Sequence, residues 1–404
     1  MGGDFIITGI ITEYNPFHKG HKYHLENAIK DTSASGVVCV MSGNFMQRGI
    51  PAIVDKWKRT EIALKNGVDL ILELPLVYSI SSAELFAFGS VSLLNSLGII
   101  DNLYFGSEEG SIEPLNKISR VLSHEPQEFK LLLKEYLNTG LPFHSSRSKA
   151  LNDYLKYDNV EHILSNSNNI LGIEYMKALD TLNSSISPYT LKREGSNYND
   201  ENMSEIFSSA TSIRKHLKNG CLSEIENILP EETYKILSEI HSKGYPFIFE
   251  EDMFKYIKYK LFTETENLKD LPDVSEGLDN KIYREILNAA SLDELILKSK
   301  SKRYTYTRIS RIFVQYFLGL EKYDLLSLAK SPAPYARILG FNSKGRDILK
   351  KMKSTCSIHI ITKVSKNNLS PHMQLDILGT KAYSLLNPNV NPADDFLKGP
   401  VIIK

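Results

Sequence analysis

The stretch "GIITEYNPFHKGHKYHLENAIK", residues 9–30, decides the fold. It joins an apolar run to a turn that contains Pro16, and then to a helical pattern that begins with His18 and His21. Further apolar runs follow at 36–41, 69–74 and 102–105, with helical patterns between them. Such runs are typical of strands buried on both faces, and their alternation with helices indicates right-handed βαβ units. The sequence therefore predicts an α/β fold with a Rossmann-like parallel sheet.

The second half of the chain has a different pattern. Segment 187–195 is compatible with a fifth strand, but past about residue 215 helical periodicity dominates, with proline and glycine at the joints. "SIHIITK", at 357–363, is the one strand expected there. We predict two domains, an α/β domain at 1–215 and a mainly α-helical C-terminal domain at 216–404.

Composition restricts the class of protein. The 404 residues include 48 basic and 48 acidic side chains, so any contact with nucleic acid must come from a local basic patch. Cys39, Cys221 and Cys356 have no metal-ligand spacing, and we expect no metal bound by protein side chains. No leader pattern or membrane-spanning run is present, so we expect a cytoplasmic protein with no membrane partner. No pattern specifies an oligomeric state.

The histidines lie where a ligand would be expected. In open α/β sheets, ligands bind beyond the carboxyl ends of the strands, and a helix N-terminus there attracts anions. Gly20 leaves room for such a ligand, and His18 and His21, three residues apart, share one face of the helix. The pair is also compatible with a metal site or an ordinary surface. For His24 we favour a packing or supporting role.

Two motifs carry a resemblance to known proteins. "HKGH" resembles the HxGH signature of the nucleotidyltransferase superfamily. "FSSATSIRK", at 207–215, is similar to the superfamily's second phosphate-binding segment, with Ser209, Thr211, Ser212 and Arg214 at corresponding places. An ordinary helix cap with a solvated arginine would give the same pattern.

Longer blocks make the resemblance more specific. The chain resembles the tRNA(Met) cytidine acetate ligase family in "GIITEYNPFHKGHKYH", "CVMSGNFMQRGIPAIVDKWKRTEIALKNGVDLILELP", "YFGSEEG", "NNILGIEYMKAL", "SATSIRK" and "PYARILGFNSKGRDIL". This resemblance implies an HxGH nucleotidyltransferase-like domain that uses ATP. We expect Mg²⁺ with the ATP only because ATP normally carries this ion. The resemblance further implies that acetate forms an acetyl-adenylate, and that the wobble cytidine of elongator tRNA(Met) then takes the acetyl group.

The resemblance also implies site residues. The catalytic candidates are His18, His21, Lys56 and Arg59, although Lys56 and Arg59 are also compatible with a solvated basic helix face. The candidates for ATP are Ile11, Thr12, Glu13, Tyr14, Asn15, Pro16, Phe17, His18, Lys19, Gly20, His21, Lys22, Tyr23, His24, Gly106, Asn169, Arg193, Ser212 and Arg214. Ser42, Gly43 and Asn44 are candidates for the acetate pocket, and Gln47 and Arg48 for pyrophosphate or RNA.

Two basic runs in the second half suit RNA phosphates. The tRNA candidates are Lys300, Lys302, Arg303, Arg308, Arg337, Lys344 and Arg346, and Tyr304 and Tyr306 lie among them. Each run alone is more often a solvated helix face than an RNA site. The rival functions are a small-molecule adenylyltransferase of coenzyme biosynthesis and a non-catalytic nucleotide- and RNA-binding protein.

Overall fold

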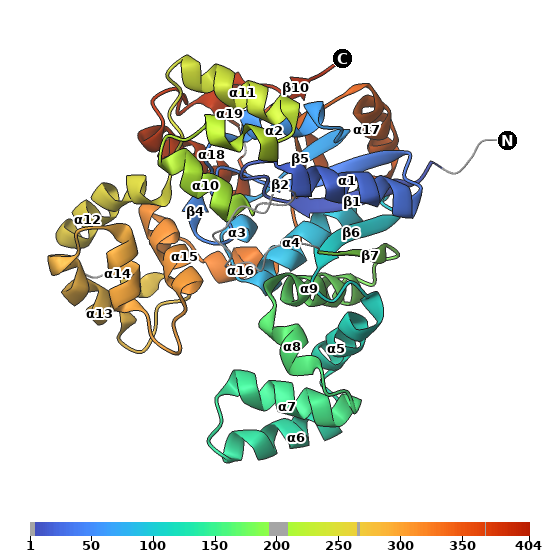
Figure 1. Ribbon diagram of the computed structural model, residues 1–404, viewed down its shortest axis with the longest axis vertical. Helices are drawn as coiled ribbons and strands as arrows, with labels where there is room; N and C mark the ends of the chain where they lie inside the picture. Colours follow the sequence, from blue (N-terminus) through green and yellow to red (C-terminus); the bar gives the residue numbers. More distant parts are fainter. Residues whose placement is uncertain (1–4, 194–208, 265–266, 368) are drawn as a thin grey trace.

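A single sheet runs through the centre of the molecule, and helices cover both of its faces (Figure 1). The structure is a computed structural model that describes residues 5–193, 209–264, 267–367 and 369–404. The strand order is β10-β8-β5-β2-β1-β6-β7, and β9 also pairs with β8. The strands are β1 (Ile7–Thr12), β2 (Gly36–Ser42), β5 (Leu70–Leu74), β6 (Asn102–Ser107), β7 (Ser187–Lys192), β8 (Tyr335–Phe341), β9 (His359–Ile361) and β10 (Val401–Ile402).

The sheet is parallel from β5 through β2, β1 and β6 to β7, and β8 alone pairs antiparallel with β5. The predicted α/β class with a mostly parallel sheet is confirmed. The four apolar runs, segment 187–195 and "SIHIITK" all contain strands, as predicted. The ends of two predicted segments, 194–195 and 207–208, lie outside the described residues.

Alternation along β2 explains why the central strands are apolar throughout. Val37, Cys39 and Met41 pack into one core cluster, whereas Val38 and Val40 pack into the other. Successive side chains of a strand point to opposite faces, so both faces of the sheet are buried. One face is covered by α1 (Lys19–Thr32), α2 (Lys56–Lys65), α10 (Ala210–Lys218) and α11 (Glu231–Ser242). The other is covered by α4 (Ala83–Ser96), α5 (Ile112–His124), α9 (Ser167–Thr181) and α17 (Ser343–Thr355).

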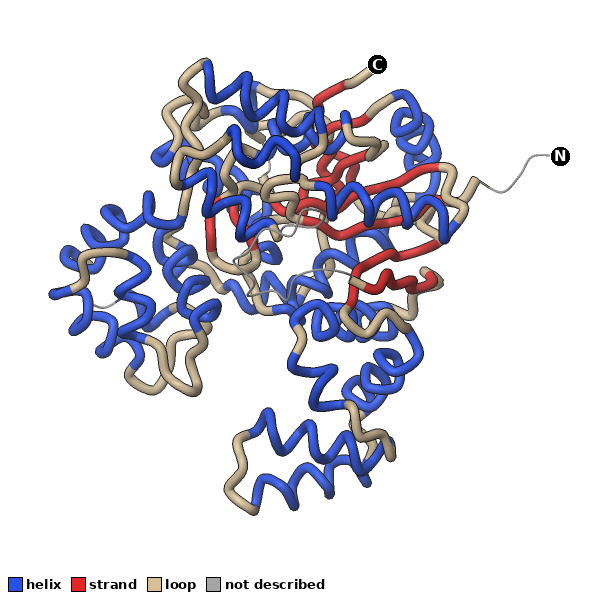
Figure 2. The backbone as a smooth tube through the Cα atoms, in the orientation of Figure 1, coloured by secondary structure: helices blue, strands red, loops and turns tan. Residues whose placement is uncertain are grey.

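Two groups of helices extend beyond these layers, and they consist of helices and loops alone (Figure 2). One, the helical lobe, comprises α12 (Phe254–Thr263), α13 (Leu278–Glu285), α14 (Leu292–Ser299) and α15 (Tyr306–Phe317). The other comprises α6 (Gln127–Asn138), α7 (Phe143–Leu155) and α8 (Val160–Ser165). Shorter elements include α3 (Leu76–Ser79), α16 (Leu325–Lys330), α19 (Asp394–Leu397) and the hairpin of β3 (Phe45–Met46) and β4 (Ile50–Pro51). The long helix α18 (Pro371–Leu386) packs against α3.

The end of the chain returns to the sheet. β8, β9 and β10 all lie after residue 215, so the central sheet takes strands from both of the predicted domains. The division into two domains at 1–215 and 216–404 stays a prediction, and the central sheet does not follow this boundary. Among the described residues, no helix has the length and apolar character needed to cross a membrane.

Candidate active site at the carboxyl edge of the sheet

The loop between β1 and α1 is held firmly at the carboxyl edge of the sheet. Tyr14 and Phe17 are buried in the core, with ring centroids 4.6 Å apart. The side-chain amide of Asn15 accepts a hydrogen bond from the Ile53 N–H at 2.9 Å and donates to the Pro51 carbonyl at 3.4 Å. Tyr14, Asn15 and Phe17 therefore support the loop, and the N-terminus of α1 takes a fixed position beside the sheet.

His18 and His21 lie together at that N-terminus, as their spacing predicts. His18 is the N-cap of α1, and its Nδ1 accepts from the Gly20 N–H at 3.0 Å. The Nδ1 of His21 accepts in turn from the His18 N–H at 3.3 Å. The two ring centroids are 3.8 Å apart. Because Nδ1 of His18 is an acceptor, a neutral His18 ring carries its proton on Nε2, where it can donate to a ligand.

The electrostatic surroundings keep these rings neutral. Burial, assisted by the positive charges of Arg193 and Arg214, lowers the pKa of His18 to about 3. Burial and the charge of Arg193 lower the pKa of His24 to about 4. The pKa of His21 is also well below its usual value, because of burial and then the neighbouring His18 and Arg193. At neutral pH the imidazoles are therefore uncharged hydrogen-bonding groups.

This arrangement makes stability depend on pH. The pKa of a histidine in the unfolded chain is about 6.5, so below that pH the unfolded chain binds protons that the folded chain does not bind. Stability therefore rises with pH through this window. We expect the thermal midpoint of the ligand-free protein to fall between about pH 7 and about pH 5.5, and to fall less in His18→Asn. Thermal denaturation at several pH values measures this, and equal pH slopes for both proteins would contradict it.

Three arginines from different segments meet near the imidazoles. Arg193 follows β7, and its N–H donates to the Ser107 carbonyl at 2.9 Å. Arg214, on α10, donates to the Asn15 carbonyl at 3.0 Å. Burial lowers the pKa of Arg48 to about 10; Glu13 opposes this shift, whereas Arg214 and Arg193 add to it. Clustered cations that disfavour one another's charge form a site that an anion would stabilise.

The second motif lies beside the first. The Ser209 hydroxyl caps α10 by accepting from the Ser212 N–H at 3.2 Å. Arg214 links this helix start to the β1–α1 loop, and its other amino group donates to Thr211 Oγ1 at 3.1 Å. The buried Ser212 hydroxyl has no hydrogen-bond partner in the described part of the chain. Two helix N-termini, each favourable for an anion, are therefore close together.

Gly106 and Asn169 lie at the neighbouring edge of the site. A Cβ on Gly106 would lie 3.3 Å from Cγ of Arg193 and 3.9 Å from Cδ2 of His24, so glycine allows these side chains to approach closely. Asn169 is fully buried, accepts from the Glu109 N–H at 2.9 Å and donates to the Ile163 carbonyl at 3.2 Å. Asn169 thus positions the loop after β6, and its side chain has partners within the protein.

The outer residues of the first motif differ in exposure. Lys19, Lys22 and Tyr23 are exposed, whereas Thr12 and the cis Pro16 are buried. Ile11, Glu13 and Gly20 are half-buried, and the Glu13 carboxylate accepts from the Gln47 N–H at 2.6 Å. The Lys19 ammonium donates to the Asn227 carbonyl.

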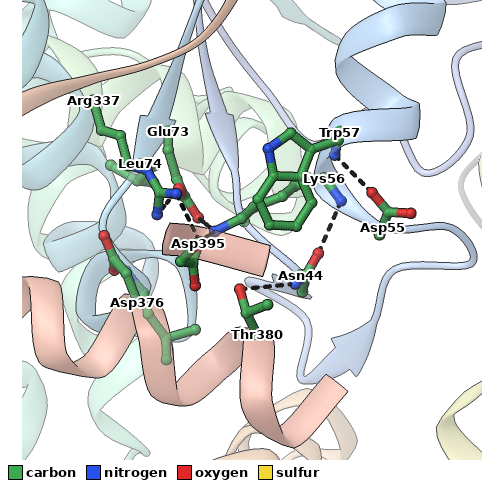
Figure 3. Close-up of polar contacts among 12 residues, drawn as sticks. Asn44, Asp55, Lys56, Trp57, Glu73, Leu74, Arg337, Asp376, Thr380 and Asp395 are labelled. Carbon is green, nitrogen blue, oxygen red and sulfur yellow. Dashed lines mark hydrogen bonds and ion pairs between the residues drawn. The ribbon is translucent and has the colours of Figure 1, made fainter. Parts of the chain in front are cut away.

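Lys56 lies in a buried network of charges (Figure 3). Its ammonium is 2.7 Å from Glu73 Oε1 and 2.7 Å from Asp395 Oδ1, and its side chain is 1% exposed. Arg337 reaches the same two carboxylates at 2.8 Å and 2.6 Å. Although burial opposes it, Lys56 and Arg337 hold the pKa of Asp395 down to about 2. These two cations are neutralised by carboxylates inside the protein.

Arg59 binds the backbone of the loops around the site. Its guanidinium donates to the carbonyls of Glu13 at 2.7 Å, Ser42 at 3.0 Å and Val54 at 3.3 Å, and also to that of Gly43. Lys56 and Arg59 are therefore not a solvated basic face. We assign them a positioning role, because their donors are used by the protein.

The expected acetate pocket is tightly packed. The Asn44 side chain accepts from the Lys56 N–H at 2.9 Å and donates to Thr380 Oγ1 at 3.4 Å. A Cβ on Gly43 would lie 2.7 Å from Glu73 Oε1. The Ser42 hydroxyl is buried and has no hydrogen-bond partner among the described residues. Of these residues, Ser42 is thus the one whose polar side chain has no partner in the described part of the chain.

The predicted tRNA-binding side chains do not share one environment. Lys300, Lys302 and Arg303 are exposed near the turn between α14 and α15, and Lys344 and Arg346 are exposed on α17. Arg308 pairs with Asp273 at 3.1 Å. Arg337 requires a correction: it lies in the buried strand β8, 4% exposed, and cannot reach RNA. Tyr304 is also buried, at 6% exposed.

Sequence reasoning missed the partners of these charges. Glu73, inside the buried strand β5, was a detectable signal, because a carboxylate in an apolar run requires a cation. Glu108 was missed as well; its carboxylate accepts from the Asn169 N–H at 2.9 Å and the Asn168 side chain at 2.6 Å. No group of three or more potential metal ligands occurs among the residues that the structure describes.

The chain matches the HIGH Nucleotidyl Transferase family over residues 6–395. It is 53% identical to the tRNA(Met) cytidine acetate ligase of Clostridium novyi, with 98% of this chain and 100% of that protein covered. It is 52% identical to the protein of the same name from Clostridium acetobutylicum, with 98% and 100% covered. The chain belongs to the tRNA(Met) cytidine acetate ligase family.

Solved structures agree with membership of this ligase family. Thermotoga maritima TmcAL bound with alpha-thio ATP is 33% identical, with a TM-score of 0.89 over 98% of this chain and 99% of that chain. Its apo form is 34% identical, with a TM-score of 0.91 and the same coverage.

Proposed function

We propose that this protein acetylates the wobble cytidine of elongator tRNA(Met), using ATP and acetate. The observation that carries the proposal is the neutral His18 and His21 pair, beside Arg193 and Arg214 and at two adjoining helix N-termini. A site of this kind suits a triphosphate, whose charge it neutralises through fixed donors. The tRNA substrate comes from the names of the curated relatives, and we propose a cytoplasmic location together with it.

The first step joins acetate to the α-phosphate of ATP. An acetate oxygen attacks the α-phosphorus, the bond to the bridging oxygen of pyrophosphate breaks, and acetyl-adenylate and pyrophosphate form. Acetate is already ionised at neutral pH, so this step needs positioning and charge neutralisation rather than a strong base. We assign the α-phosphate to His18 and His21, and the pyrophosphate portion to Arg48, Arg193 and Arg214. The buried Ser42 hydroxyl is our candidate for holding acetate.

The second step transfers the acetyl group. The exocyclic amine of cytidine attacks the acetyl carbonyl carbon, the mixed-anhydride bond breaks, AMP leaves and the amine loses one proton. Gly106 lets the backbone approach the nucleoside, and Asn169 holds the adjoining loop. Magnesium is proposed to accompany ATP as its counterion.

Labelled acetate tests this function. The protein is incubated with ATP, labelled acetate and total tRNA, and the destination of the label is determined. Label on the wobble cytidine of elongator tRNA(Met) is expected. Label-free tRNA with a stable dinucleotide product would favour a small-molecule adenylyltransferase, and absence of turnover would favour a non-catalytic nucleotide-binding protein.

The exposed basic turn before α15 should contribute to tRNA binding. Because Lys302 and Arg303 are exposed, replacing both with Ala should weaken tRNA binding and lower the slope of log affinity against log salt by roughly 1–2. Formation of acetyl-adenylate should not change. Acetate-dependent pyrophosphate exchange measures this step. If exchange fell in parallel with binding, the turn would have a structural role instead.

A further inference from the structure

The α6–α7 hairpin projects from the body of the molecule (Figure 1). It exposes large apolar side chains that the core does not use: Leu131 is 53%, Leu137 39% and Phe143 58% exposed. Exposed apolar side chains grouped on a projecting element mark an interaction surface.

Phe143 carries a cation against its ring. The guanidinium of Arg147, one turn further along α7, lies 5.8 Å from the ring centroid. The Nε of Arg147 has no hydrogen-bond partner among the described residues. An exposed aromatic ring beside a guanidinium is a platform on which an unpaired nucleic acid base stacks.

The hairpin also carries cations that can contact phosphates. From 127 to 155, the span of α6 and α7, the basic side chains are Lys130, Lys134, Arg147 and Lys149, and the acidic ones are Glu128, Glu135 and Asp153. Lys130, Lys134 and Leu137 follow one face of α6, because helical positions three and four apart are neighbours. Lys130 has an exposed partner, Glu125, at 3.5 Å, and a pair of this kind is easily exchanged for a phosphate.

The chain that follows the hairpin leads back to the active site. The chain leads from α7 through α8 to α9, whose N-terminus is held by the Glu108 carboxylate. The charge of Glu108 also acts on Arg48 and Arg193. The proposal requires that a substrate too large for the site extends from the arginines toward the hairpin.

We propose that the α6–α7 hairpin is a second tRNA contact, in which Phe143 and Arg147 stack an unpaired base and Lys130 and Lys134 bind phosphates. The inference rests on the proposed function, because tRNA is the substrate named there. It adds a contact on a part of the chain distant from the basic turn before α15.

Substitution of Phe143 tests the stacking. Phe143→Ala should raise the Kd for tRNA on the order of tenfold, because a base stacked on an aromatic ring contributes substantially to affinity. Phe143→Leu should fail equally, since it keeps apolar area but has no aromatic face, whereas Phe143→Trp should retain binding. Gel-shift titration measures Kd, and acetate-dependent pyrophosphate exchange should stay at the level of the unsubstituted protein in all three variants.

A matched pair of double variants tests the phosphate contacts. Lys130→Ala with Lys134→Ala should weaken tRNA binding and lower its salt dependence. The control replaces two exposed lysines, Lys235 on α11 and Lys243 directly after this helix. Because α11 lies at the other end of the molecule in Figure 1, this control should leave Kd unchanged.

Unchanged tRNA affinity in Phe143→Ala and in the Lys130 and Lys134 double variant would overturn the inference and leave the surface for a protein partner. Loss of pyrophosphate exchange in these variants would also overturn it, because the hairpin would then shape the site. Failure of the proposed function has a different signature: the unsubstituted protein itself would not acetylate tRNA.

Discussion

Replacing His18 with Asn lowers acetate-dependent pyrophosphate exchange by about 100-fold or more, while the protein stays folded. The reason lies in the two tasks of this side chain. Its Nδ1 caps α1 by accepting from the Gly20 N–H, and its Nε2 is the donor that we propose binds the phosphate. Asparagine is among the best N-cap residues, so the variant keeps the cap and loses the imidazole donor.

His18→Ala provides the comparison. It loses both the cap and the donor, so its activity should match that of His18→Asn, but its stability should fall by about 1 kcal/mol more. Exchange rates and thermal midpoints of both variants separate the two tasks. Exchange by His18→Asn within a fewfold of the unsubstituted rate would remove His18 from the phosphate site.

Replacing Lys56 with Met destabilises the protein by roughly 3–5 kcal/mol, because the change leaves buried carboxylates with one cation fewer. Glu73 and Asp395 would share Arg337 alone, in surroundings where side chains are 4% exposed or less.

Lys58→Met is the matched control on the same helix. Lys58 is 38% exposed and pairs with Glu61 at 3.1 Å, and such exposed pairs contribute at most about 1 kcal/mol. Chemical denaturation of both variants gives the difference. Adding Asp395→Asn to Lys56→Met should restore part of the stability, because it removes one unpaired charge. Equal stability of the Lys56 and Lys58 variants would contradict the account.

The central strands could be predicted because burial on both faces leaves apolar runs in the sequence. β8 could not be predicted in the same way. Its sequence, "YARILGF", contains Arg337. The segment that follows the strand is rich in lysine and arginine, so the sequence suggests that Arg337 belongs to an exposed basic surface. The arginine is buried because Glu73 and Asp395, from distant parts of the chain, neutralise it. Pairing across such sequence distances leaves no local pattern.

The site shows the same contrast. The spacing of His18 and His21 predicts that they lie together, because side chains three residues apart on a helix share one face. Lys56 and Arg59 have the same spacing and also share a face, but this face is turned into the protein. Spacing predicts which side chains lie together; it does not predict whether they meet solvent, substrate or buried carboxylates.

The central claim is that the N-terminus of α1, with His18 and His21, binds the phosphates of ATP. A crystal structure of this protein with a non-hydrolysable ATP analogue tests it most directly. The account predicts the α-phosphate within hydrogen-bond distance of an imidazole nitrogen of this pair, and the remaining phosphates against Arg193 and Arg214. Phosphates bound elsewhere, with both imidazoles free of the nucleotide, would contradict it.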